Sequence, residues 1–417
     1  MLWKLLIQGK VVFMETIDSR KRGLLALNHE IPDRVPIGIG GCFGTSIMAG
    51  IYNKLKEVLG FKEIPTKIYD IFGQSAEIDI EVLNALGCDF IFYHRPRSDI
   101  CDIYDYEWKT WNLHDNTPVL VPNDFNPRLE LDGSYVLDTG TAVYKMSKSS
   151  DYFDFIKYPY ENLTKPSEIK NIILPVIDGY ELKALVDRAK RAYFNTEKVV
   201  VFSSNISVLE SAQYGFGWTN LMVYLKENID FVKTYMDLVL ENNIENLKII
   251  LPNIDKLTHV IEVSDDLGMQ MGPQISLKMY RDIIKPRQKI LYEYIKNNSN
   301  IQIMIHSCGS IYDFIPDLIE LGVDIINPIQ ISAFKMNPIK LKKEFGKYIC
   351  FWGGGVDVQS TLPFADVKEI RNEVIKNIKV FMKGGGYIFS TTHTIQNDSP
   401  VDSILSLVLA AKQYGNY

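Results

Sequence analysis

The chain has 417 residues, of which 46% are hydrophobic and 23% charged, and its net charge is −6. This composition is typical of a globular protein with a substantial core, and it argues against a disordered or membrane-spanning chain. The five cysteines are an odd, widely scattered set, so no disulfide framework is expected and a cytoplasmic location fits best. The sequence has no cluster of Lys or Arg that could bind the phosphate groups of a nucleic acid, so nucleic acid is not an expected partner. A membrane is not an expected partner either.

Residues 1–22 lack an apolar run long enough for a signal peptide, and we interpret them as an N-terminal arm before a domain spanning 23–417. The length alone leaves one elaborated barrel or two ordinary domains open. Short β-rich runs occur at 35–41, 88–93, 198–205, 259–266, 301–308, 323–330, 348–357 and 387–393. Amphipathic helices are predicted over 66–86, 219–248, 278–297, 311–321 and 366–383. Eight strands alternating with helices predict an α/β fold, a (β/α)8 TIM-like barrel.

Residues 100–160 interrupt this rhythm. They alternate with a period of two and contain turn dipeptides, which is typical of antiparallel strands rather than helices. A separate small domain is one interpretation of this segment. The one we favour is an inserted antiparallel β segment that forms a lid or rim at the barrel mouth.

The run IQIMIHSCGS places His306 and Cys308 two positions apart on a predicted strand, so both side chains leave one face and can bind one ion. A hydrogen-bonded core histidine beside an inert buried cysteine is the alternative. The last predicted strand ends in His393 at the same C-terminal rim, where a capping role is the alternative. Three protein ligands would leave one position of a tetrahedral zinc open, as in catalytic zinc sites.

Acidic and amide side chains accompany these candidate ligands. Asp265, Asp266 and Gln270 follow a predicted strand at the same rim and are candidate catalytic residues, although helix capping is an alternative for Asp266. Glu262 lies inside that strand, and because a buried carboxylate needs a cation it is a candidate fourth metal ligand. Glu210 competes for the same role.

Six motifs follow one another along residues 20–415: PDRVPIGIGG, DDLGMQMGPQIS, IHSCGS, NPIQ, FWGGGVDVQSTLP and THTIQNDSPVDSI. In order and spacing they resemble the uroporphyrinogen decarboxylase family. The resemblance implies a distorted (β/α)8 barrel, in agreement with the strand count. That family contains both porphyrinogen decarboxylases and zinc-dependent methyltransferases that work with corrinoid proteins, so the fold does not fix the function.

Two features of the chain favour the methyltransferase branch. The decarboxylases carry an arginine-rich loop after the first strand, whereas residues 38–50 here read GIGGCFGTSIMAG and contain no arginine. In the methyltransferases a His-x-Cys pair and a later cysteine bind zinc. His306 and Cys308 match the pair, and His393 stands in place of the later cysteine.

This ligand set indicates a direction of methyl transfer. Two neutral histidines and one thiolate would leave a zinc site with a net charge of about +1, which suits polarising the oxygen of a methyl ether. We therefore predict methyl transfer from a methoxylated, aromatic substrate to the cobalt of a separate corrinoid protein, with a homodimer as a further expectation. Tyr93, His94, Trp111 and Phe351 are candidates for an aromatic pocket, with core packing as the alternative for each.

Three other functions stay open from the sequence. One is a methyltransferase that moves methyl groups from the corrinoid protein to a thiol or folate. The second is a metal-free lyase of the uroporphyrinogen decarboxylase type, and the third is a non-catalytic corrinoid-binding protein. Both methyltransferases are expected to bind zinc, whereas the lyase and the non-catalytic protein are not. A measurement of bound metal therefore distinguishes these two groups of functions.

Overall fold

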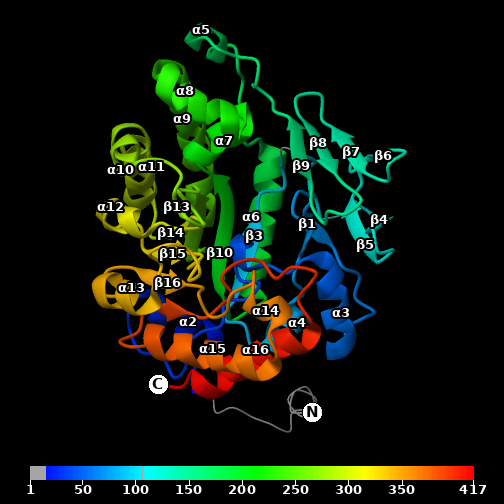
Figure 1. Cartoon of the computed structure of the whole chain (residues 1–417), viewed down its shortest axis with the longest axis vertical. Coiled ribbons are helices and arrows are strands. Elements are labelled where there is room, and N and C mark those ends of the chain that lie inside the picture. Colours follow the sequence, from blue (N-terminus) through cyan, green and yellow to red (C-terminus); the bar gives the residue numbers. More distant parts are fainter. Residues whose placement is uncertain (1–15, 99, 106) are drawn as a thin grey trace.

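The computed structural model describes residues 16–98, 100–105 and 107–417 of the chain (Figure 1). Most of the predicted N-terminal arm, residues 1–15, lies outside the described residues. The first helix, α2, spans Ser19–Leu27 and so begins within the range assigned to the arm. It begins there because Asp18 accepts a hydrogen bond from the Lys21 N–H at 2.7 Å, which caps the helix.

A curled parallel sheet forms the centre of the molecule (Figure 1). Its strands follow the order β17-β16-β15-β14-β11-β10-β3, and every neighbouring pair is parallel. The strands are β3 (Phe90–His94), β10 (Val199–Ile206), β11 (Val260–Ser264), β14 (Gln302–His306), β15 (Ile325–Asn327), β16 (Cys350–Trp352) and β17 (Tyr387–Ile388). Helical crossovers connect them, as parallel strands require.

The two edges of this sheet are joined by the first predicted strand, residues 35–41. On one side, the Gly38 N–H donates to the Phe389 carbonyl and the Phe389 N–H to the Pro36 carbonyl, both at 2.8 Å. On the other side, the Asp89 N–H donates to the Ile37 carbonyl at 2.8 Å. The segment therefore lies between β17 and β3 and closes the sheet, which confirms the predicted (β/α)8 barrel.

The interior of the barrel is an apolar cluster separate from the layer between strands and helices. It comprises Leu27, Cys42, Phe90, Val199, Val201, Val260, Met304, Ile325, Cys350, Trp352 and Ile388, each at most 2% exposed. Because side chains alternate along a strand, the next inward positions after Val260, Met304 and Ile325 belong to Glu262, His306 and Asn327. The barrel thus has an apolar floor and polar inward groups near its C-terminal end.

Helices cover the outside of the barrel (Figure 1). The longer ones are α3 (Ala49–Leu59), α4 (Ile80–Leu86), α6 (Gly179–Phe194), α7 (Leu209–Phe216), α8 (Trp218–Glu227), α9 (Ile229–Ile254), α11 (Lys285–Asn298), α12 (Ile315–Glu320), α13 (Pro338–Phe345), α15 (Val367–Phe381) and α16 (Val401–Tyr414). Single turns form α5 (Pro166–Ile169), α10 (Leu277–Met279) and α14 (Thr361–Phe364). No helix of the described residues is long and apolar enough to cross a membrane.

Helix α15 illustrates why these segments are helical. Its first turn carries a capping box between Asp366 and Glu369, in which each side chain accepts a hydrogen bond from the backbone N–H of the other residue. The buried residues Ile370, Val374 and Ile378 recur every four positions and form one apolar face. Burying that face holds the helix on the barrel.

The structure agrees with most of the predicted helices. Those over 278–297, 311–321 and 366–383 are confirmed by α11, α12 and α15, while the range 219–248 is divided into α8 and α9 at Asn228. The helix over 66–86 is wrong in its first half, where β1 (Ile68–Asp70) pairs antiparallel with β2 (Ser75–Ala76). The Gly73 N–H donates to Asp70 Oδ1 at 3.1 Å and stabilises the turn between these strands.

The predicted insertion is confirmed as two small antiparallel sheets beside the barrel (Figure 1). The first pairs β4 (Trp108–Asn112) with β5 (Pro118–Pro122). The second contains β6 (Arg128–Leu129), β7 (Tyr135–Asp138), β8 (Val143–Met146) and β9 (Asp154–Lys157). The Leu120 N–H donates to the Thr66 carbonyl at 2.7 Å, so the insertion is tied to the segment before β1.

Candidate metal centre

Three candidate ligands meet at the C-terminal rim of the barrel. Donor atoms of His306, Cys308 and His393 all lie within 4.8 Å of one another. His306 is the last residue of β14, but Cys308 lies beyond that strand and His393 lies in the loop after β17. The prediction that all three side chains lie on strands is therefore wrong for Cys308 and His393. Cys308 leaves the strand because its N–H donates to the side chain of Asp266 instead of a neighbouring strand.

Hydrogen bonds fix the orientation of the His306 ring. Asn327 donates from Nδ2 to the Trp352 carbonyl at 3.3 Å, which leaves Asn327 Oδ1 facing His306 Nδ1 at 3.0 Å. His306 Nδ1 therefore carries the proton, and Nε2 offers its lone pair toward Cys308 Sγ, 3.4 Å away. A hydrogen bond of this kind aligns metal-binding histidines and makes the ligating nitrogen more basic.

A short 3₁₀ turn, η1 (Phe43–Thr45), forms one wall of the site. A Cβ added at Gly44 would lie 2.5 Å from Cε1 and Nδ1 of His306, closer than any side chain tolerates. Glycine therefore lets this backbone lie directly against the imidazole. The loop that follows the first barrel strand thus packs against a candidate ligand.

Cys308 is positioned mainly through its backbone. Its N–H donates to Asp266 Oδ1 at 2.7 Å, and the next residue, Gly309, adopts φ +76° and packs against the backbone of Gly268. Burial and the nearby carboxylates of Asp266 and Glu210 raise the pKa of the Cys308 thiol well above its usual value. A bound cation would oppose this effect, because the thiolate is the form that binds metal.

His393 completes the cluster as a neutral imidazole. Its ring centroid lies 5.5 Å from that of His306. Burial and the neighbouring His306 lower the pKa of His393 to about 4, so its ring is uncharged at neutral pH and keeps a lone pair for a ligand bond. Two imidazoles and one thiol are donors that zinc prefers, and the residues present therefore fit a zinc ion.

Glu262 lies deeper in the barrel and is 3% exposed. Its Oε2 accepts the Phe43 N–H at 3.1 Å, whereas its Oε1 has no hydrogen-bond partner. Burial raises the pKa of Glu262, and the nearby His306 acts in the opposite direction. Within the described part of the chain, the group whose donors lie within 4.8 Å of one another does not include Glu262. Its assignment as the fourth ligand stays a prediction.

Glu210, the rival fourth ligand, lies in the first turn of α7 and is also outside that group. The Tyr214 hydroxyl donates to its Oε1 at 3.2 Å, and the Ser264 hydroxyl donates to its Oε2. Burial and the charge of Asp266 raise the pKa of Glu210 to about 8. Glu210 therefore holds a proton at neutral pH at the edge of the metal centre.

Of the three candidate catalytic residues, only Asp266 directs its side chain at the cluster, where it accepts the Cys308 N–H. Asp265 contacts the cluster through its backbone, because its N–H donates to the His306 carbonyl at 3.0 Å. Asp265 Oδ1 accepts three backbone N–H groups at the start of α7, from residues 208 to 210, and its Oδ2 accepts from Gln288 Nε2. It caps that helix from the position directly after β11. The exposed Gln270 donates to the Ser332 carbonyl at 2.8 Å and so connects two rim loops.

Three of the four aromatic residues expected in a pocket lie elsewhere. Tyr93 stacks on Phe202, with ring centroids 5.2 Å apart, in the layer outside the barrel. Phe351 packs against Phe381 of α15 in the same layer. Trp111 packs within the insertion. Phe90 and Trp352 face inward. Tyr93 lies three positions after Phe90 and Phe351 lies one position before Trp352, and because side chains alternate along a strand both face outward.

Other aromatic side chains lie at the barrel mouth. The ring of Tyr69 lies 6.0 Å from Phe43, 5.0 Å from Phe92 and 5.3 Å from His94, measured between centroids. We call these four residues the mouth cluster. Because the Phe43 N–H binds Glu262, the mouth cluster adjoins the carboxylate beneath the metal centre. Of the predicted pocket residues, only His94 belongs to it.

Sequence reasoning missed Phe92, Tyr69, Asn327 and Gly44. The position of Phe92 could have been inferred from strand alternation once Phe90 is assigned to the interior. Asn327 lies in the motif NPIQ at the end of a predicted strand, which is also a usable signal. No local pattern indicates that Tyr69 or Gly44 approaches the site, because their neighbours are distant in sequence.

The fold and this site define a (β/α)8 barrel with three candidate metal ligands at its C-terminal rim. Residues 168–414 match the family model described as Uroporphyrinogen decarboxylase (URO-D). Since the match spans more than half of the chain, the protein belongs to the URO-D family. No curated protein sequence gives a significant match to the chain.

A solved structure of a methyltransferase from Methanosarcina mazei is similar to this structure, with a TM-score of 0.60 and 15% sequence identity. The alignment covers 95% of this chain and 99% of the other. At this level of identity the similarity establishes a shared fold. The reaction has to be argued from the site.

Proposed function

We propose that the protein is a zinc-dependent methyltransferase that moves a methyl group from a methoxylated, aromatic substrate to the cobalt of a separate corrinoid protein. The observation that carries this proposal is the convergence of His306, Cys308 and His393 within 4.8 Å at the mouth of a URO-D-family barrel. Catalytic zinc sites commonly have three protein ligands and one open position. The similarity to a solved methyltransferase adds support.

The loop after the first barrel strand argues against a porphyrinogen decarboxylase. Residues 38–50 contain no arginine that could bind several substrate carboxylates. In their place the loop presents Phe43 at the mouth and the Gly44 backbone against His306. This wall suits a flat, weakly charged substrate better than a polycarboxylate.

The donor set favours a methyl ether as the methyl donor. Two neutral histidines and one thiolate give a site with a net charge of about +1, and a zinc ion there would act as a Lewis acid toward the ether oxygen. Asn327 holds His306 with Nε2 toward the centre, and the lowered pKa of His393 keeps its ring neutral. Among His306, Cys308 and His393, one ligand is thus anionic rather than two.

The mouth cluster and Glu210 have separate roles in this proposal. The rings of Phe43, Tyr69 and Phe92 provide edges and faces against which an aromatic substrate can pack. Burial and the charge of Asp266 raise the pKa of Glu210, so this carboxyl group can hold a proton and give it to the oxygen that leaves when the C–O bond breaks. The methyl group passes to reduced cobalt, whose electron pair forms the new bond, so the products are the hydroxylated donor and the methylated corrinoid.

A metal assay followed by methyl transfer tests the proposal. We expect about one zinc per chain in protein prepared with zinc available. We also expect that protein to demethylate methoxylated aromatic compounds in the presence of cob(I)alamin, with Cys308→Ala as the inactive control. A zinc-loaded protein that transfers methyl groups only from methylcobalamin to thiols or folates would reverse the assigned direction. A protein that takes up no zinc would overturn the proposal altogether.

A further inference from the structure

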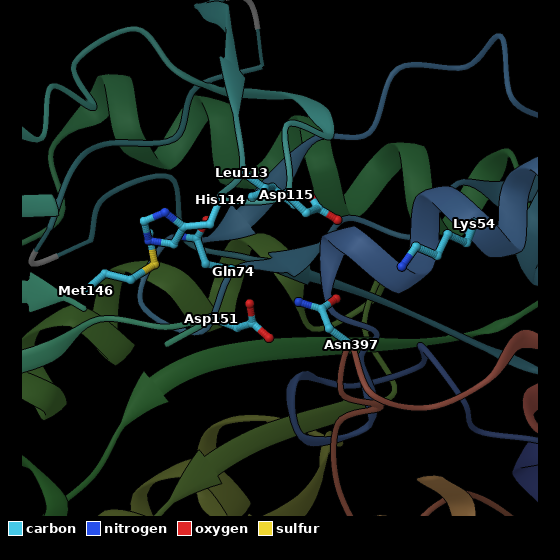
Figure 2. A pocket seen from close by; sticks show the side chains of 8 residues that line it. All are labelled: Lys54, Gln74, Leu113, His114, Asp115, Met146, Asp151 and Asn397. Atoms are coloured by element: carbon cyan, nitrogen blue, oxygen red, sulfur yellow. The ribbon is translucent and has the colours of Figure 1, made fainter. Parts of the chain in front are cut away.

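Amide side chains tie the loops at the C-terminal rim of the barrel to their neighbours. In the loop after β17, Asn397 lines the cavity shown in Figure 2, and its Oδ1 accepts the Ile51 N–H of α3 at 2.9 Å. This bond lies four residues beyond the candidate ligand His393. The loop after β14 is held differently, because there the side chains of other loops bind the peptide groups on both sides of a candidate ligand.

That ligand is Cys308. Its own N–H donates to Asp266 Oδ1 at 2.7 Å, and the N–H of the next residue, Gly309, donates to Gln330 Oε1 at 2.8 Å. Cys308 lies outside β14, which ends at His306, so strand pairing does not fix its backbone. The direction in which Cys308 presents its sulfur is therefore set by these two side chains.

A second glutamine fixes the orientation of Gln330. Gln270 Nε2 donates to the Ser332 carbonyl at 2.8 Å, so its Oε1 is left as an acceptor and receives Gln330 Nε2 at 2.7 Å. Gln330 must then present its own acceptor, Oε1, to the Gly309 N–H. The opposite orientation would place one donor against another. The two glutamines thus form a directed bridge that ends at the peptide next to Cys308.

The backbone that carries Gln270 is also packed against the ligand loop. Gln270 directly follows β12 (Gly268–Met269). A Cβ added at the first residue of this strand would lie 2.6 Å from the Cys308 carbonyl oxygen, so only glycine permits this approach. The carbonyl of the second residue accepts the Ser310 N–H at 2.9 Å. This segment therefore contacts the ligand loop through its backbone and holds Gln330 through its side chain.

We propose that Gln330 and Gln270 are positioning residues that hold the sulfur of Cys308 at the metal centre. This inference deepens the proposed function and rests on the zinc site that it names. Each glutamine acts through the peptide next to Cys308 and not as a ligand. Loss of the bridge leaves the Gly309 N–H without its acceptor and frees this peptide to rotate, which displaces the sulfur from a bond to zinc that is about 2.3 Å long.

Zinc affinity and the absorption spectrum of the Co(II)-substituted protein test this inference. Gln330→Leu removes the acceptor with little change in side-chain volume, and it should weaken zinc binding about tenfold in competition with a chelator. The sulfur-to-Co(II) charge-transfer band should weaken and shift. Gln302→Leu is the matched control, because Gln302 is equally half-buried and donates to Asn28 Oδ1 at 3.3 Å, but at the opposite end of β14. It should leave both measurements unchanged.

The reactivity of the Cys308 thiol gives a readout that needs no metal. Cys308 is half-buried, whereas the other four cysteines are buried, so a dithiobis(nitrobenzoate) reagent added to folded, metal-free protein reacts first with Cys308. Gln330→Leu should raise the rate severalfold because the ligand loop is released, and Gln302→Leu should not. If the protein binds no zinc, the proposed function fails, while this rate still tests whether the bridge holds Cys308.

A double-mutant cycle tests the bridge itself. Gln270 acts on Cys308 through Gln330, so Gln270→Leu should weaken zinc binding in the parent and have little further effect in Gln330→Leu. Gln270 is exposed, so its variant is expected to fold, and melting temperatures verify folding for all variants. Additive losses would overturn the bridge. A folded Gln330→Leu that keeps the zinc affinity, the Co(II) spectrum and the thiol reactivity of the parent would overturn the proposal.

Discussion

Replacing Asn327 with leucine tests whether the hydrogen bond to His306 Nδ1 tunes the candidate metal centre. Asn327 is fully buried, and it connects the Trp352 carbonyl at 3.3 Å with His306 Nδ1 at 3.0 Å. Leucine removes the acceptor, which frees the imidazole to rotate and makes Nε2 less basic. Losses of this kind weaken metal affinity about 10–100-fold, or by about 1.4–2.7 kcal/mol. The unpaired Trp352 carbonyl should also lower the free energy of unfolding by about 1–3 kcal/mol.

Competition for zinc between the metal-free protein and a fluorescent chelator measures this affinity at neutral pH. Asn377→Leu is a matched control, because Asn377 is 2% exposed and donates to the Gly355 carbonyl at 3.2 Å. It should lose similar stability and keep the zinc affinity of the parent. If folded Asn327→Leu binds zinc as tightly as the parent, the hydrogen bond does not tune the site and the reasoning fails.

Three further predictions address the same site. Cys308→Ala should lose zinc, measured by metal analysis, while circular dichroism and the melting temperature stay close to those of the parent; unfolding would instead indicate a structural cysteine. His393→Cys adds a second thiolate and should slow ether demethylation while zinc stays bound, so an unchanged rate would contradict the electrophile argument. In metal-free protein the pKa of Glu210 is about 8 in the folded state against an ordinary 4.5. The protonated carboxyl therefore contributes to the free energy of unfolding below about pH 4.5, and this contribution is lost as the pH rises through about 8. Glu210→Gln should therefore gain stability over the parent across this range in denaturant titrations, and a pH-independent difference would show that Glu210 is not protonated.

The sequence predicts the barrel strands well because each is a short apolar run, such as the valines 199–201 of β10. It fails at β1 and β2, whose pairing depends on contacts made elsewhere in the chain. The Ala49 N–H donates to the Gln74 carbonyl at 2.9 Å, and Met48 forms a β-bridge with Ser75. A periodicity that suggests a helix over 66–86 is overridden by these contacts.

The candidate ligands could be identified from sequence, whereas the surrounding pocket could not. His306 and Cys308 lie in a recognisable motif, and their proximity follows from two-residue spacing. Pocket residues depend on which face of each strand points inward. The choice of Tyr93 instead of Phe92 shifts the side chain to the opposite face, because side chains alternate along a strand.

The metal centre also depends on closure of the barrel, which no local pattern encodes. Strands β14 and β17 are separated by β15 and β16, so in a flat sheet they would lie about 14 Å apart at roughly 4.8 Å per strand. Curling of the sheet and the loops after both strands bring the donors of His306 and His393 within 4.8 Å. The segment that closes the barrel at Ile37 continues into Gly44, which packs against His306. One stretch of chain therefore determines both the closure of the barrel and the geometry of the candidate ligands. A substitution that opens the barrel at this segment should also move the three ligands apart.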